Sequence, residues 1–255
     1  MTPSAIEPRP ATPQSLHTPV ADHTDSAWKP LYRIGGGAAL LAVACIIASI
    51  AVFLAWPPPT TVESWFALFQ RNALLGLLDL DLLLVTSYVL LIPLYLALYV
   101  ALRRVSQSLM TIALASNMLG AALILGVNPG AAMLTLSDRY AAATTDAQRA
   151  IFLAAGQALI TNWSGSAFVV GYLLGGIGVL ITAAVMLQSG IFSKFIAYTG
   201  LVMGTMMLVP ASAGTVGLLL SLVSLAPTVL WLILIARKLF QFGAPDEMEV
   251  LDASA

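Results

Sequence analysis

Residues 82–102 read LLLVTSYVLLIPLYLALYVAL, and no charged side chain lies between Asp81 and Arg103. A helix needs about 20 mostly apolar residues to cross a hydrocarbon core of about 30 Å, because each residue adds about 1.5 Å. The stretch therefore predicts a membrane-spanning helix, which we place near residues 76–102. The rest of the fold follows from stretches of the same kind.

Four further stretches of the chain lack charged side chains. The third of them is interrupted by NWSGS (162–166), and the fourth is divided into two by PASAG (210–214), since clusters of small and polar residues favour loops. Together these stretches predict six spans, near residues 34–56, 76–102, 108–127, 167–187, 191–209 and 216–236.

Residues 150–161, which precede NWSGS, are too few to cross a bilayer on their own. Thr145 and Gln148 have the spacing of a capping box, which predicts a helix start at this point. We therefore expect an extra amphipathic helix over residues 146–161, before span four. It either lies at the outer membrane surface or continues span four outward.

The composition agrees with this reading. Of the 255 residues, 59% are hydrophobic and 9% are charged, whereas soluble domains carry about 25% charged residues. We expect an all-α fold, a polytopic transmembrane helix bundle surrounded by the lipid bilayer. With 11 Lys and Arg against 12 Asp and Glu, the chain has no basic surface for nucleic acid.

The basic residues are unevenly divided between the two ends of this bundle. Six spans place both termini on one side, and the cytoplasmic side of a membrane protein carries the excess of Lys and Arg. We therefore expect both termini in the cytoplasm and the protein in the cytoplasmic (inner) membrane. The side of the termini carries Arg9, Lys29, Arg33, Arg103, Arg104, Lys194, Arg237 and Lys238, and the other side carries Arg71, Arg139 and Arg149.

Neither end of the chain carries a long apolar run. Residues 1–30 are rich in proline, serine and threonine, so we expect a disordered cytoplasmic tail. Residues 241–255 predict a short acidic cytoplasmic tail, and the transmembrane domain is then expected over residues 31–240.

Three segments follow one another in the order of a known family: LLVTSYVLLIPLYLALYVALRRVSQSLMTIALASNMLGA (83–121), SDRYAAATTDAQRAIFLAAGQAL (137–159) and GYLLGGIGVLITAAVMLQSGIFSKFIAYTGLVMG (171–204). Over roughly residues 30 to 240 the chain resembles an uncharacterised bacterial family of small six-helix membrane proteins, a domain of unknown function. The most specific parts are the end of span two at Arg103 and Arg104, and the Ser189-Gly190 turn before Lys194. The resemblance implies the topology and a cytoplasmic-membrane location, and it implies no activity or catalytic residue.

Polar side chains at membrane depth are the first candidates for function, because lipid does not solvate them. Asp81, Tyr88 and Tyr95 are spaced by seven residues, which places them on one helical face. With Asn117, near the midpoint of span three, they form a candidate polar cavity. The alternatives are interfacial charges at Asp79 and Asp81, tyrosines paired with backbone carbonyls, and an interhelical bond at Asn117.

Pro93 and Pro227 fall inside spans two and six, where each removes a backbone amide and favours a kink. A kink can mark a binding site, as in transporters, or can serve packing alone. Two pairs of glycines have the small-xxx-small spacing that lets helices approach closely, and we expect internal packing faces or oligomer contacts there. These pairs are Gly171 with Gly175 and Gly200 with Gly204.

The predicted spans hold no residue set for catalysis, a metal or a cofactor. His17 and His23 precede the first span, and Cys45 is the single cysteine. We therefore expect a non-enzymatic protein without a cofactor, which binds or moves a small apolar or weakly polar molecule in an outward-opening cavity between spans two, three and four. The alternative is an accessory or scaffold subunit that packs against another membrane complex or a second copy. An intramembrane enzyme is the least expected.

Overall fold

The computed structural model describes residues 26–80 and 82–244, and these residues form helices without any strand. The expected all-α fold is therefore confirmed for this part of the chain. A short 3-10 turn, η1 (Ser26–Trp28), leads into the helices α1 (Lys29–Ala55), α2 (Val62–Arg71), α3 (Ala73–Asp79), α4 (Leu82–Leu102), α5 (Gln107–Val127), α6 (Gly130–Ala142), α7 (Asp146–Trp163), α8 (Ser166–Ser189), α9 (Lys194–Met206) and α10 (Gly214–Phe242).

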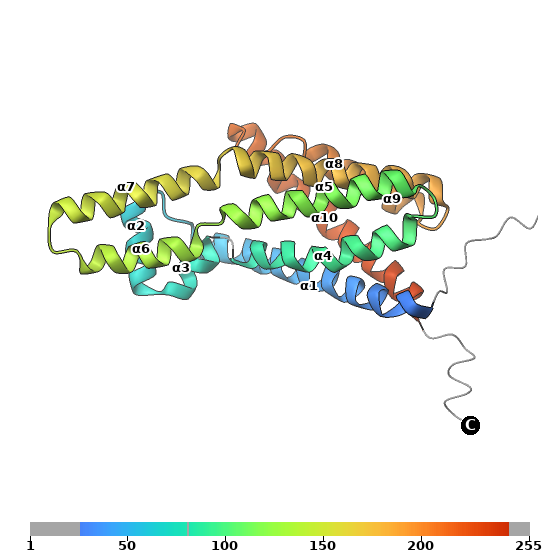
Figure 1. Ribbon diagram of the computed structural model, residues 1–255, viewed down its shortest axis with the longest axis horizontal. Helices are drawn as coiled ribbons and strands as arrows, with labels where there is room; N and C mark the ends of the chain where they lie inside the picture. The colour runs from blue at the N-terminus through green and yellow to red at the C-terminus, as the bar shows by residue number, and fades with distance from the viewer. Residues whose placement is uncertain (1–25, 81, 245–255) are drawn as a thin grey trace, which may run out of the picture.

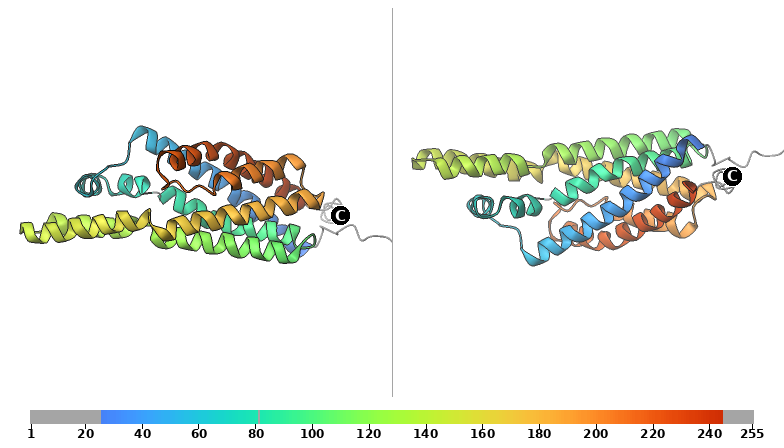
Figure 2. Two further views of the ribbon diagram at one scale, coloured as in Figure 1. Left: turned by 90° about the horizontal axis from the view of Figure 1, so that it is seen from above. Right: turned by 90° about the horizontal axis from the view of Figure 1, so that it is seen from below.

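The helices divide into a long bundle and a smaller layer at one of its ends (Figure 1). In the bundle, α5 packs against α8, α1 packs against both α4 and α10, and α9 packs against α8 and α10. The smaller layer, which we call the cap, holds α2, α3, α6 and α7; α6 and α7 extend beyond the bundle as a hairpin (Figure 2). The opposite end, which we call the terminal end, joins the start of α1 to the end of α10, because Arg33 Nε donates to the Gly243 carbonyl over 2.6 Å.

Three helical runs break where the bundle meets the cap: α3 to α4, α5 to α6, and α7 to α8. Pro129 causes one break, because proline lacks an amide and disfavours helical backbone at Asn128, whose ψ is 123°. The Asn128 side chain ties two breaks together. Its Nδ2 donates to the Leu80 carbonyl over 2.9 Å, and its Oδ1 accepts from the Gly130 amide over 3.0 Å.

The lengths between these breaks and the terminal end match a bilayer. The helices α4 and α5 have 21 residues each, or about 31 Å, close to the thickness of a hydrocarbon core. Five helical stretches of the described chain are long and apolar enough to cross, so the protein is embedded in a membrane. They are Lys29–Ala55, Leu82–Leu102, Gln107–Ala142, Asp146–Ser189 and Gly214–Phe242.

The structure moves some of the expected boundaries. The span placed at 76–102 is divided, because α3 ends at Asp79 and α4 begins at Leu82. The span placed at 191–209 contains α9, whose 13 residues extend only about 20 Å. The helix expected at 146–161 corresponds to α7, but α2 and α6 have no counterpart among the expected helices.

The ends of the chain are described only in part. Of the expected tail 1–30, residues 1–25 lie outside the described residues, while residues 26–30 belong to η1 and the first turn of α1. Of the expected tail 241–255, residues 245–255 lie outside them, and α10 continues to Phe242.

The bundle and the cap each bury an apolar cluster. The bundle cluster surrounds Trp231, which lies fully buried on α10, and the cap cluster surrounds Phe66 of α2. Glycine lets the bundle helices approach: a Cβ added at Gly35 of α1 would lie 2.8 Å from Ala97 Cβ of α4. The cap is therefore a packed layer with its own core rather than a set of loops.

Candidate functional site

The expected polar cavity on spans two and three stays a prediction. Asp81 lies outside the described residues, while Tyr88 and Tyr95 lie half-buried on α4. Tyr95 packs against the apolar cluster of the bundle. Two hollows of the described chain, one in the cap and one at the start of α5, are lined by other residues.

Asn117 faces α8 instead. It is buried on α5, and its Nδ2 donates to the Ala113 carbonyl of its own helix over 2.9 Å. Its amide occupies the space that a Cβ at Gly178 would need. Its Oδ1 has no hydrogen-bond partner, so Asn117 is a packing residue between α5 and α8 that carries an unpaired acceptor.

The two prolines lie inside continuous helices. The carbonyl of Pro93 in α4 borders α1, 3.1 Å from where a Cβ at Gly35 would stand. Near Pro227 in α10, the Thr228 hydroxyl donates to the Ser224 carbonyl over 2.7 Å. Neither proline lines either of the two hollows named above.

The four glycines of the expected packing pairs lie at contacts between bundle helices. A Cβ added at Gly171 would lie 2.9 Å from the Gly120 carbonyl, and Met207 Cε would lie 3.4 Å from one at Gly175. A Cβ added at Gly200 would lie 2.6 Å from Trp231 Nε1, and one at Gly204 would meet Leu180. All four therefore face helices or loops of the same chain.

One carboxylate is unexpectedly buried. Asp79 ends α3, just before α4 begins, and only 2% of it is exposed. Its Oδ1 has no hydrogen-bond partner. Burial raises the pKa of this carboxyl above its ordinary value of 3.8, because removal from water disfavours the charged form.

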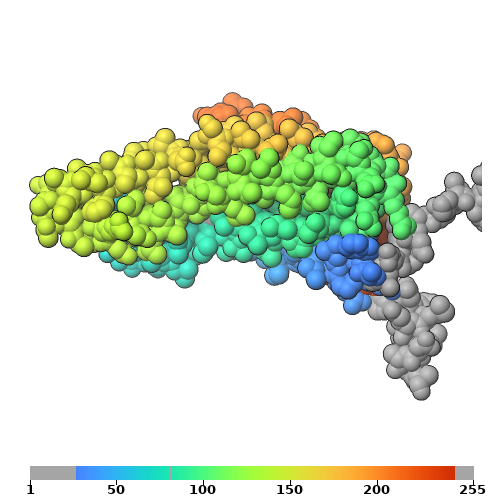
Figure 3. Space-filling view, viewed as in Figure 1, coloured from blue at the N-terminus to red at the C-terminus, as the bar shows by residue number. Residues whose placement is uncertain are grey.

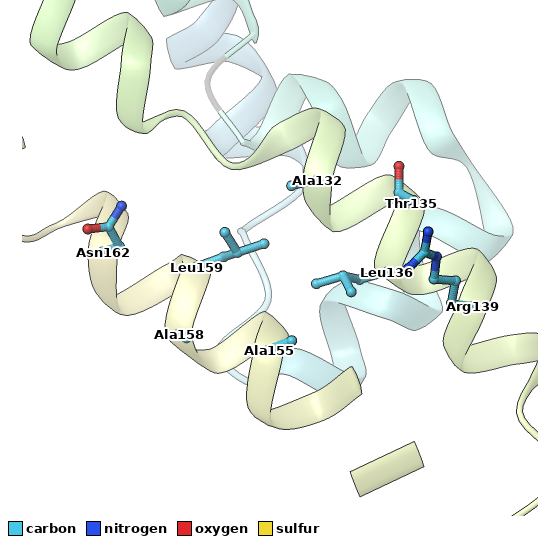
Figure 4. Close-up of a pocket in the computed structure, with 8 residues that line it drawn as sticks. All are labelled: Ala132, Thr135, Leu136, Arg139, Ala155, Ala158, Leu159 and Asn162. Atoms are coloured by element: carbon cyan, nitrogen blue, oxygen red, sulfur yellow. The ribbon is translucent and has the colours of Figure 1, made fainter. Parts of the chain in front are cut away.

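The cap contains a hollow of about 650 Å³ between α6 and α7 (Figure 4). Leu136 and Leu159 point toward each other across it, and the space-filling view shows the two helices side by side at the far end of the molecule (Figure 3). We call this hollow the cap groove. It is lined by Ala132, Thr135, Leu136 and Arg139 of α6 and by Ala155, Ala158, Leu159 and Asn162 of α7.

Local sequence builds the hairpin that holds the groove. Thr145 caps α7 by accepting from the Gln148 amide over 3.3 Å, and Gln148 Oε1 accepts in turn from the Thr144 amide over 3.1 Å. These bonds satisfy amides that a helix start leaves open. The turn between α6 and α7 is therefore short and the two helices run antiparallel (Figure 1).

The helix α2 holds the hairpin from another side. Gly156 of α7 allows close contact, since a Cβ there would lie 2.6 Å from Val62 Cγ1. Gln70 Nε2 donates to Ser137 Oγ over 2.8 Å and to Asp138 Oδ1 over 3.1 Å. Ser137 Oγ donates to the Phe66 carbonyl over 3.1 Å, so α2 is fastened to both α6 and α7.

Alanine and leucine side chains form most of the groove lining. Thr135 uses its hydroxyl within α6, where it donates to the Ala131 carbonyl over 3.0 Å. Arg139 is exposed at the end nearer the hairpin tip and makes no ion pair or hydrogen bond within the described chain, whereas Arg149 pairs with Asp146 over 3.9 Å. The groove thus combines an apolar lining with one free cation and, at the other end, the amide of Asn162.

Comparison with known proteins identifies a family for this chain. The model of a protein family described as a domain of unknown function, DUF4386, matches residues 34–240. The chain belongs to the DUF4386 family. No curated protein and no solved structure matches it.

The match to DUF4386 includes both layers of the fold. The range 34–240 runs from the first turns of α1 almost to the end of α10 and takes in every helix of the cap. The cap groove therefore belongs to the DUF4386 region of the chain and not to an added segment.

The charge-free stretches do not predict the groove, because α6 carries Asp138 and Arg139, which lie beyond the end of such a stretch. A signal was present nonetheless. Ala132, Leu136 and Arg139 follow one another at helical spacing, as do Ala155, Leu159 and Asn162. That spacing indicates one face on each helix, but it does not indicate that the two faces meet.

Proposed function

We propose that this DUF4386 protein is a non-enzymatic membrane protein that binds a small amphiphilic molecule in the cap groove. The observation that carries the proposal is a hollow of about 650 Å³ lined mainly by alanine and leucine, with Arg139 and Asn162 at its ends and Thr135 between them. Its volume falls within the range of about 300–1,000 Å³ that is common for small-molecule sites. We propose the groove as the candidate site, and the cavity expected between spans two, three and four stays a prediction.

The proposal includes a topology in which the cap lies outside the cell. Six crossings are completed if residues 207–213 carry the chain from the end of α9 to the level of the cap. The basic residues Lys29, Arg33 and Arg103 lie at the terminal end of the bundle, as do most others, which supports cytoplasmic termini and a place in the cytoplasmic membrane. In this orientation α7 is the predicted outer helix, and it continues α8 outward.

A binding experiment can test the groove directly. The purified full chain in lipid nanodiscs is irradiated with hexadecanol that carries a diazirine on its chain, and the labelled peptides are identified by mass spectrometry. We expect labelling of groove residues on α6 and α7. Ala158→Trp, which fills the groove, should abolish that labelling, whereas Ala154→Trp on an exposed part of α7 should retain it.

Equal labelling of the groove in both tryptophan variants would contradict the proposal, as would absence of groove labelling in the native chain. Labelling of lipid-facing residues of the bundle serves as the internal standard, because the variants leave those helices unchanged. Circular dichroism of both variants checks that they retain the helical fold.

A scaffold function is the second candidate. Gly37 of α1 meets no atom within 4 Å, and Ile34 and Leu41 near it are exposed, so this face of α1 is open to a partner helix. Purification from native membranes in a mild detergent tests it. A partner that is lost with Gly37→Leu would support the scaffold role, and a monomer without a partner would contradict it.

A further inference from the structure

We propose that the ligand of the cap groove is an anionic single-chain amphiphile drawn from the outer leaflet, whose head group binds Arg139 and whose chain descends along α6 and α7 toward the membrane. This inference rests on the proposed function of the groove. It adds the charge of the ligand, its direction and its source.

The direction follows from the position of the groove relative to the helix breaks. Ala132 lies two residues beyond Gly130, where α6 begins, and Arg139 lies nine residues beyond it. At about 1.5 Å per residue these positions are about 3 Å and about 14 Å above the break. On α7, Asn162 lies next to the other break and Ala155 lies toward the tip. The groove therefore runs from the membrane surface up to Arg139.

The lining fits a single chain. Five of the eight lining residues are exposed, so the groove is shallow and open along one side, and Leu136 and Leu159 form its apolar wall. One hydrocarbon chain can lie along the row between α6 and α7 in contact with both leucines. An unbranched hydrocarbon chain buries apolar surface along the whole groove, which is the main source of its affinity.

The head group is assigned by charge. Arg139 is the cation among the lining residues, and it has no carboxylate partner within the described chain. Guanidinium binds carboxylate or phosphate through two parallel hydrogen bonds. The neighbouring Asp138 makes no ion pair with it within the described chain, and its Oδ1 accepts from Gln70 on the α2 side of the hairpin.

The height of Arg139 above the helix break indicates where the head group of the ligand lies. The head groups of a bilayer occupy roughly 5–8 Å beyond the hydrocarbon core. A head group at Arg139, about 14 Å above the break, lies beyond that zone. The bound amphiphile is therefore lifted partly out of the leaflet, with the upper part of its chain shielded by the groove instead of by lipid.

Matched acidic and neutral probes test the inference. The protein in nanodiscs is labelled with diazirine-bearing hexadecanoic acid or hexadecanol, and the ratio of groove labelling by the two probes is measured. We expect the acid to label the groove about 10-fold more than the alcohol, as one charge-assisted pair provides. Arg139→Gln should bring the ratio close to one, and Arg149→Gln, whose cation already pairs with Asp146, should leave it unchanged.

The outcomes separate this inference from the proposed function. Equal labelling by acid and alcohol in the native chain, or a preference that survives Arg139→Gln, overturns the anionic ligand but leaves the groove as a binding site. If neither hexadecanoic acid nor hexadecanol labels the groove, both the anionic ligand and the proposed function are overturned. A water-soluble diazirine octanoate tests the source: labelling by octanoate without labelling by hexadecanoate overturns the origin in the leaflet.

Discussion

At the scale of single residues, the structure buries polar side chains that have atoms without a hydrogen-bond partner. Asp79 is the clearest, since it is 2% exposed and its Oδ1 lacks a partner. Asn117 has an unpaired Oδ1 inside the bundle. Both lie where two helices meet, so a change in either side chain also changes the packing of those helices.

We expect Asp79→Asn to stabilise the protein at neutral pH. The carboxyl has a raised pKa in the folded state, so its contribution to stability is fully present below the ordinary value of 3.8 and is lost as the pH rises through the folded pKa. The variant removes the buried charge, which should raise the melting temperature at pH 7 by about 2–4 °C. The difference should shrink as the pH is lowered.

Thermal unfolding in detergent between pH 4 and pH 8 measures this effect. Asp138→Asn is the control, because it makes the same substitution at an exposed carboxylate. A difference in melting temperature between Asp79→Asn and the native chain that stays constant across this pH range would contradict the burial of Asp79.

The contact of Asn117 with Gly178 gives a second expectation at this scale. Gly178→Ala should destabilise the bundle by about 1–3 kcal/mol, because its Cβ overlaps the Asn117 amide. The double variant with Asn117→Ala should lose less stability than the sum of the two single variants. Gly37→Ala is the control, since no atom lies within 4 Å of that position. Additive losses in denaturant titrations would show that the two residues do not share this space.

At the scale of elements, the sequence predicts what the membrane dictates. The stretches without charge predict α1, α4, α5, α8 and α10, because lipid requires about 20 apolar residues in each span. In the cap, helix α6 carries two exposed charged residues, Asp138 and Arg139, so the absence of charge does not mark it.

The cap groove could not be predicted from the sequence for a related reason. The spacing of Tyr88 and Tyr95 predicts one helix face, but the partners of Asn117 depend on which helix lies beside α5. That neighbour is α8, more than 40 residues away in the chain. The cap groove likewise arises only when α6 and α7 lie side by side, and non-local pairing of this kind is not contained in the periodicity of one segment.

The fastening of α2 to the hairpin is a property of elements, and Gly156 is its test. Gly156→Leu should displace α2, because the new side chain would occupy the position of Val62 and Phe66. Amide hydrogen exchange of α2 should then increase by roughly 10-fold or more, while exchange in α5 and α8 should remain slow. Ala154→Leu, on an exposed part of α7, should leave α2 protected. Protection of α2 that is unchanged by Gly156→Leu would show that the cap does not depend on this contact.

At the scale of the whole molecule, the cap and the terminal end lie at opposite ends of the bundle, separated by the length of α4 and α5, about 31 Å. Arg33 joins α1 to the end of α10, so both described ends of the chain lie on the same side. The short helix α9 is the element on which the count of six crossings depends. It ends at Met206, and Met207 contacts Gly176 of α8 before the chain turns at Pro210.

Cysteine labelling distinguishes the orientations and tests the role of α9. In a Cys45→Ala background, Ala141→Cys at the hairpin tip should react with a membrane-impermeant maleimide in intact cells, and Ser108→Cys at the start of α5 should react only after permeabilisation. Ser212→Cys should behave as Ala141→Cys does, because residues 207–213 have to reach the level of the cap for α10 to cross back to Gly243. Reaction of Ser212→Cys only after permeabilisation would remove the sixth crossing, and reaction of Ser108→Cys in intact cells would invert the protein. In that inverted orientation the cap groove would face the cytoplasm, and the leaflet that supplies its amphiphile would be the inner one.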